Sequence, residues 1–240
     1  MTHNLISSSA DRGVIVWSHS AAQNNSLMPK LCHVKELRSC LAATWNHRGD
    51  KWACAGSSGH VFVGTFNHEN NMWLAYSQTE EPPRGKPLHK ATVTEIRFDP
   101  ASGRAIASAS CDGTVLITSA YKEDVDTDTG SGPFAAVTED YGDVLFRLKT
   151  SVWNNTLSWS PSGATLAFAS HDCEMHFAEF TPELVAETIA SSGKAKPATK
   201  RVVYSGNPIL NGSFINESTY IGCGYDNAPL IFKKQGDGSW

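Results

Sequence analysis

The chain has 240 residues, of which 40% are hydrophobic and 18% charged, a composition typical of folded globular proteins and not of disordered ones. Its net charge of −4 argues against a nucleic-acid-binding protein, because such proteins usually present a strongly basic face. We find no apolar run of about 18 residues and no basic region followed by an apolar stretch at the start, so we expect neither a membrane span nor a secretory signal. Six cysteines are scattered without a CxxC pair, which predicts free, buried thiols.

The first stretch predicts two strands joined by a turn. Residues 5–17 read LISSSADRGVIVW, in which Asp11 begins the turn between two apolar runs. Residues 18–29 are polar and predict a loop, and residues 30–37 alternate well enough for an outer strand.

A second, similar unit follows at residues 41–66, which read LAATWNHRGDKWACAGSSGHVFVGTF. Its second turn carries Ser58 in place of aspartate. We expect an outer strand at 73–77 and then a loop at 80–85, because consecutive prolines cannot join a central strand.

The third unit, residues 93–118, is the most complete. VTEIRF alternates apolar and polar residues, and Asp112 with the next glycine is a strong hairpin signal. Residues 122–132 are acidic and predict a long loop, after which residues 144–149 predict an outer strand.

Two further units complete the chain. Residues 154–180 form the fourth, with His171-Asp172 at its second turn. Residues 183–190 are compatible with a short helix, and residues 201–205 predict an outer strand. Residues 210–232 form the fifth unit.

A fixed strand pattern separated by variable loops is the signature of a repeat array, and four-stranded units of this length indicate a β-propeller. We therefore predict an all-β fold, a single partial β-propeller domain. Its blade-like units lie near residues 1–37, 38–78, 89–149, 153–205 and 208–240.

Aspartates at the second turns have a predicted structural role. A carboxylate there can accept hydrogen bonds from backbone N–H groups and so link neighbouring blades. The residues concerned are Asp11, Asp112, Asp172 and Asp226. His89 is a candidate partner in the third unit, whereas the second unit has no such carboxylate.

His171-Asp172 resembles a catalytic pair, but it occupies the position of the structural turn aspartate. The sequence contains no HExxH, no Cys/His zinc spacing and no Gly-rich phosphate loop. We therefore predict no catalytic residues, no cofactor and no metal.

Five stretches are distinctive: SADRGVIVWS (9–18), FNHENNMWLAYS (66–77), SCDGTVLITSAYKEDVD (110–126), WSPSGATLAFASHD (159–172) and CGYDNAPLIFKKQGDG (223–238). In this order, from end to end, they resemble one WD-repeat family, subunit 1 of the actin-related protein 2/3 complex. Residues 127–152 match it poorly beyond Pro133-Phe134.

The resemblance implies a seven-bladed ring, of which this sequence would supply an incomplete ring of about four to five blades. The family's first and seventh blades, and its insertion that reaches toward actin, have no counterpart here. We therefore expect a truncated gene model, a fragment, or a variant that needs partners to cover its end blades. Exposed strand edges and apolar blade faces predict that the chain alone is poorly soluble or oligomeric.

The same resemblance implies a non-catalytic scaffold in the cytoplasm, at the actin cytoskeleton. Its partners would be actin-related proteins and other subunits of the complex, with the actin filament reached indirectly. The predicted contact residues are Ala120, Tyr121, Lys122, Glu123 and Phe134, because loops on rigid scaffolds carry recognition. A generic WD-repeat adaptor in another assembly is the alternative, and an enzyme on a propeller scaffold is a third possibility without defensible catalytic groups.

Overall fold

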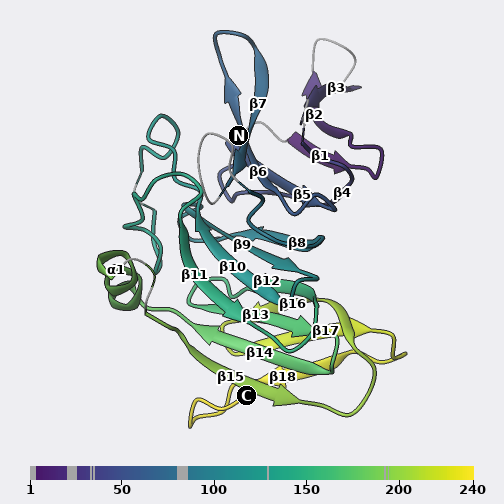
Figure 1. Cartoon of the computed structure of the whole chain (residues 1–240), viewed down its shortest axis with the longest axis vertical. Helices are drawn as coiled ribbons and strands as arrows, with labels where there is room; N and C mark the ends of the chain where they lie inside the picture. Colours follow the sequence, from purple (N-terminus) through teal and green to yellow (C-terminus); the bar gives the residue numbers. More distant parts are fainter. Residues whose placement is uncertain are drawn as a thin grey trace.

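A computed structural model of the chain describes residues 4–20, 26–32, 34, 36–79, 86–128, 130–191, 193 and 195–240. In these residues the chain forms five antiparallel sheets that follow one another along a curved arc (Figure 1). Within the described ranges, no helix is long and apolar enough to cross a membrane.

Three of the sheets have four strands and two have three, and in each the strands pair in chain order. The first two sheets contain β1 (Asn4–Ser8), β2 (Val14–Ser20) and β3 (Ser26–Cys32), and then β4 (Cys40–Trp45), β5 (Lys51–Gly56), β6 (Val61–Asn67) and β7 (Met72–Gln78). The third contains β8 (Val93–Phe98), β9 (Ala105–Ser110), β10 (Thr114–Ser119) and β11 (Val144–Lys149). The last two contain β12 (Asn154–Trp159), β13 (Thr165–Ser170), β14 (Glu174–Glu179) and β15 (Ala198–Val203), and then β16 (Ile209–Asn216), β17 (Thr219–Gly224) and β18 (Leu230–Lys233).

The second strand of each four-stranded sheet is buried along its whole length. These strands read KWACAG, AIASAS and TLAFAS. Their many small residues allow a sheet to pack closely against a neighbour on both faces, as blades of a propeller do. The structure is therefore an all-β partial β-propeller, an open arc of five blades.

A β-bulge recurs at the equivalent position in four of the five sheets. The first strand of each of the last four sheets shifts register against the second strand near its start. The shifts lie between Cys40 and Ala42, Val93 and Glu95, Asn154 and Thr156, and Ile209 and Asn211. An extra residue at such a point bends the strand and increases its twist.

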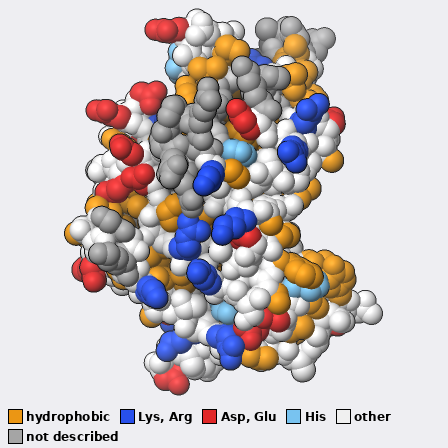
Figure 2. Space-filling model, viewed as in Figure 1, with side chains coloured by type: hydrophobic (Ala, Val, Ile, Leu, Met, Phe, Trp, Pro, Cys, Tyr) orange, Lys and Arg blue, Asp and Glu red, His pale blue; other side chains and the backbone are white. Residues whose placement is uncertain are grey.

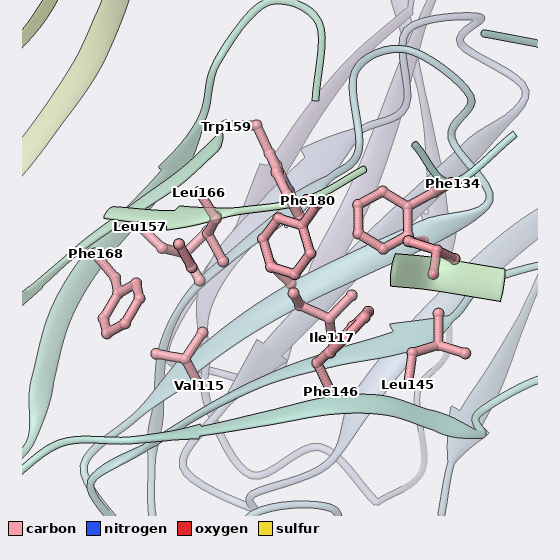
Figure 3. Packing of buried hydrophobic residues seen from close by; sticks show 14 of the residues in the cluster. Val115, Ile117, Phe134, Leu145, Phe146, Leu157, Trp159, Leu166, Phe168 and Phe180 are labelled. Atoms are coloured by element: carbon pink, nitrogen blue, oxygen red, sulfur yellow. The ribbon is translucent and has the colours of Figure 1, made fainter. Parts of the chain in front are cut away.

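The hydrophobic core lies between successive sheets. Figure 3 shows the part between the third and fourth sheets, where the rings of Phe134, Phe146, Trp159 and Phe180 meet. The Phe134 ring centroid lies 5.4 Å from those of Trp159 and Phe180, within the range of favourable aromatic pairs. These rings join the third blade to the fourth.

Several sequence-based boundaries differ from the structure. The first outer strand lies at Ser26–Cys32 and not at 30–37, because an outer strand tolerates Pro29. The last outer strand of the fourth sheet is Ala198–Val203 and not 201–205. The helix α1 (Pro182–Ala190) confirms the expected short helix, and its N-cap Thr181 accepts a hydrogen bond from the backbone of Leu184.

The loop predicted at 80–85 lies outside the described residues. All six cysteines are free. The prediction that they are buried holds for Cys32, Cys40 and Cys54, and Cys173 is half-buried. It is wrong for Cys111 and Cys223, which are exposed at a turn and on the last sheet.

Candidate functional site

The connection between β10 and β11, residues 120–143, contains all five predicted contact residues, and we call it the exit segment. It extends along the left side of the arc in Figure 1. In the same view of Figure 2, Asp and Glu side chains gather along that margin. Exposed carboxylates of the exit segment belong to Glu123, Asp124, Asp128, Asp140 and Asp143.

The structure separates the predicted contact residues into two groups. Tyr121 and Lys122 are half-buried and Glu123 is exposed, so a partner can reach these three. Ala120 and Phe134 have no exposed surface. Their apolar side chains fill the spaces between sheets, where burial stabilises the fold, and this places them in the core and not on a contact surface.

A buried ion pair attaches the exit segment to the second blade. Lys51 Nζ, at the start of β5, lies 2.8 Å and 2.6 Å from the two carboxylate oxygens of Asp126. It also donates to the Ala120 carbonyl at 2.9 Å. The guanidinium of Arg48 binds the same carboxylate. Burial lowers the pKa of Lys51, and the charge of Asp126 opposes this effect.

Arg104, at the base of β9, holds the backbone of the exit segment. Its guanidinium donates to the carbonyls of Asp126 and Asp128 at 3.0 Å and 2.9 Å, and to that of Val137 at 3.2 Å. The ring of Tyr121 lies over the same guanidinium at 5.0 Å. The acidic run, predicted as a long loop, is therefore anchored at several points.

A second set of contacts links the exit segment to β7. Tyr141 Oη donates to the backbone carbonyl of Tyr76 at 2.6 Å, and Lys122 Nζ lies 3.6 Å from the Tyr76 ring centroid. Directly before the exit segment, the carbonyl of Ser119 in β10 accepts a hydrogen bond from Gln78 Nε2, at the end of β7, at 2.9 Å. The second and third blades thus hold the exit segment between them.

The turn aspartate of the third blade accepts several hydrogen bonds. Asp112 Oδ2 accepts from the backbone of Lys90 at 2.8 Å and lies 3.3 Å from His89 Nδ1. Oδ1 accepts from the backbone and hydroxyl of Thr114 at 2.9 Å and 2.6 Å. His89 Nε2 in turn meets the Ser108 hydroxyl at 2.8 Å. Burial would raise the pKa of Asp112, but these hydrogen bonds hold it well below its usual range.

The other turn aspartates differ in how far away along the sequence their hydrogen-bond partners lie. Asp226 accepts from the backbone and the side chain of Asn207, both at 2.7 Å, and so links its turn to the connection before its blade. Asp172 accepts from the Ser170 hydroxyl of its own sheet. Asp11 accepts from the backbone of Gly13, two residues away.

His171 and Asp172 have separate environments. His171 Nδ1 lies 3.3 Å from Asn155 Oδ1, and its ring packs on Trp153 with centroids 4.5 Å apart. Ser170, which donates to Asp172, is fully buried. In the part of the chain that the structure describes, no group of three or more His, Cys, Asp and Glu side chains has the geometry to hold a metal ion.

Two hollows were not predicted from the sequence. One, of roughly 330 Å³, lies between the first strands of the sheets and is lined in part by Trp45, Phe98 and Trp159. A larger groove of roughly 1400 Å³ separates the first two sheets, and Phe66 and Trp73 line it together with Asp124 of the exit segment. Both are assembled from residues of different blades.

The sequence comparisons agree with this architecture. The family model described as "WD domain, G-beta repeat" matches residues 85–119, which include the first three strands of the third sheet. Over 240 residues, the chain is 26% identical to the actin-related protein 2/3 complex subunit 1A of Arabidopsis thaliana, covering 100% of this chain and 57% of that protein. The chain is homologous to subunit 1 of the actin-related protein 2/3 complex.

Other relatives give the same result. Subunit 1A-B of Xenopus laevis is 24% identical over 98% of this chain and 58% of its own length. Subunit 1 of Schizosaccharomyces pombe is 23% identical over 97% of this chain and 56% of its own length. The homology to subunit 1 thus extends along nearly all of this chain, which spans little more than half the length of these relatives.

Proposed function

We propose that the chain acts as a non-catalytic scaffold subunit of an actin-related protein 2/3 complex and supports actin nucleation and branched filament assembly. The observation that carries the proposal is the match to subunit 1 along all 240 residues. Its partners are then actin-related proteins and other subunits, with the filament reached indirectly, in the cytoplasm at the actin cytoskeleton.

The anchoring of the exit segment supports a scaffold role. A loop recognises a partner with little entropy cost when its backbone is already ordered. Lys51 and Arg104 order this segment from two blades, and Tyr121, Lys122 and Glu123 remain accessible on it. We propose that these three residues contact a partner subunit.

We further propose that the five units form one domain in which the turn aspartates stabilise individual turns and, at Asp112 and Asp226, neighbouring connections. A structural role for Asp172 agrees with its hydrogen bond to the buried Ser170. A catalytic role would need His171 and Asp172 to converge on a substrate. Instead, His171 contacts the side chain of Asn155, and Asp172 accepts a hydrogen bond from Ser170.

The test is affinity capture of the tagged full chain from cell extract, with actin-related proteins measured by quantitative mass spectrometry. We expect their recovery, and a reduced yield for Tyr121→Ala. Lys149→Ala, an exposed change on β11, is the matched control. Reproducible absence of actin-related proteins, with other partners recovered instead, would replace this proposal by a generic WD-repeat adaptor.

A further inference from the structure

Tyr76, Tyr141 and Lys122 form a cluster at the border between the second and third blades. The Lys122 ammonium nitrogen lies 3.6 Å from the ring centroid of Tyr76 and 4.4 Å from that of Tyr141. Both distances are well within the range of about 6 Å for cation–π attraction. We call the two tyrosine rings the aromatic cage.

The cage is held by contacts that do not involve the Lys122 side chain. Tyr76 belongs to β7, and its backbone carbonyl accepts the hydrogen bond of the Tyr141 hydroxyl at 2.6 Å. The backbone of Gly142 donates to the Ser119 carbonyl at 2.9 Å, which fixes the chain beside Tyr141. Burial raises the pKa of the Tyr141 phenol, so it remains a neutral hydrogen-bond donor. The two rings therefore keep their places if the lysine side chain leaves.

The Lys122 ammonium is weakly held by comparison with that of Lys51. Among the residues that the structure describes, no carboxylate forms an ion pair with Lys122 Nζ, whereas Lys51 Nζ has both oxygens of Asp126. Burial also lowers the pKa of Lys122, so the charged group loses hydration in this position. The two ring contacts and the nearby charge of Asp124 offset part of that loss.

The backbone of Lys122 does not depend on its side chain. Its N–H donates to Asp126 at 2.8 Å, and Asp126 is fixed by Lys51. The side chain can therefore turn out of the cage into solvent while the exit segment stays in place. Tyr76 is 40% exposed, so the cage is open to a cation from outside.

We propose that the aromatic cage is a binding site for an alkylammonium group of a partner protein, and that Lys122 is its exchangeable internal occupant. The group that fits is a lysine or methylated-lysine side chain, because aromatic faces bind compact ammonium ions that retain few hydrogen bonds. The charge of Asp124 also favours a cation at this place. The aromatic cage lies on the surface that we propose contacts a partner subunit, but the cage proposal does not rest on that function. It is tested with the chain alone.

The experiment is a titration of the full chain, carrying ¹³C-labelled tyrosine, with tetramethylammonium chloride at constant ionic strength. We expect separable ring signals from the six tyrosines, and Tyr76→Phe and Tyr141→Phe assign the two of interest. In Lys122→Ala we expect saturable shifts of both signals, with an affinity roughly five-fold tighter than in the wild type, because the internal competitor is gone. Adding Tyr76→Leu to Lys122→Ala should abolish these shifts.

Two further variants and a check of folding serve as controls. Lys149→Ala should bind as the wild type does, because this exposed lysine lies on β11 and makes no contact with the cage. Lys122→Gln serves as a second emptied variant, and circular dichroism confirms that each variant is folded. Equal affinity of the wild type and both emptied variants, or no saturable shift in either emptied variant, would overturn the proposal. Neither result would bear on the capture of actin-related proteins.

Discussion

Lys51 and Asp126 form an ion pair in which neither side chain is exposed, although they lie 75 positions apart and belong to different blades. Removing one partner of such a pair leaves a charge buried without compensation. The pair therefore affects both the stability of the chain and the position of the exit segment.

We expect Lys51→Met to lower the free energy of unfolding by about 3 kcal/mol, the low end for a broken buried pair, because Arg48 still binds Asp126. Urea unfolding followed by tryptophan fluorescence measures the change. The double variant Lys51→Met with Asp126→Leu should recover part of the loss, since no buried carboxylate remains. A loss below about 0.5 kcal/mol in the single variant would show that the pair is not buried in solution.

The turn aspartates provide a matched comparison. We expect Asp112→Ala to cost about 2 kcal/mol, because His89, Lys90 and Thr114 lose an ionised acceptor. Asp11→Ala should cost less than about 0.5 kcal/mol, because Asp11 is exposed and its bond to Gly13 is local. Thermal unfolding of the two variants under one condition measures the difference, and equal losses would contradict a special role for Asp112.

Asp112 also gives the stability a pH dependence. Hydrogen bonds hold its pKa below the usual range despite burial, so the unfolded state takes up this proton first as the pH falls. The contribution of Asp112 to the free energy of unfolding is complete above the ordinary Asp pKa of about 4, and it is lost as the pH falls below that value. The difference in free energy of unfolding between the wild type and Asp112→Asn should therefore shrink from about pH 6 to about pH 3. A difference that stays constant over this range would refute the assignment.

Phe134 distinguishes a core residue from a contact residue. We expect Phe134→Ala to lower the free energy of unfolding by about 3–5 kcal/mol, because it opens a cavity beside Trp159 and Phe180. Differential scanning calorimetry measures this effect. Unchanged stability with a loss of partner capture would instead place Phe134 at an interface.

The end sheets expose apolar side chains. Leu31 of the first sheet is 70% exposed and Ile231 of the last is 58% exposed. Such residues on sheet faces favour association, so the isolated chain should show concentration-dependent mass in light scattering coupled to gel filtration. Leu31→Lys together with Ile231→Lys should reduce it. A monomeric wild type that unfolds cooperatively would contradict this expectation.

The repeated strand pattern could be predicted from the sequence because it depends on local order. The alternation in VTEIRF and the glycine turns identify β8 to β10 directly. The first outer strand could not be placed correctly, because Pro29 suggests a loop unless the edge position of its strand is known.

The candidate site was less accessible to sequence reasoning. Residues 120–123 could be singled out, but the burial of Asp126 depends on its contacts with Lys51 and Arg104, which lie far away in the sequence. Phe134 carries no periodic signal, since it lies in an irregular connection and is buried only when two blades close around it. Contacts of this kind join residues that are distant in the sequence. They depend on how the blades pack, which cannot be predicted from a local sequence pattern.

The bulge near the start of each of the four inner strands β4, β8, β12 and β16 has a consequence for where this chain can accept insertions. Each of these four units carries its own bend, so the connections between them are not needed to set the direction of the next one. Insertions as long as the exit segment can then accumulate between strands without disturbing the order of the blades. The surface of this chain can therefore change while the arrangement of its blades stays the same.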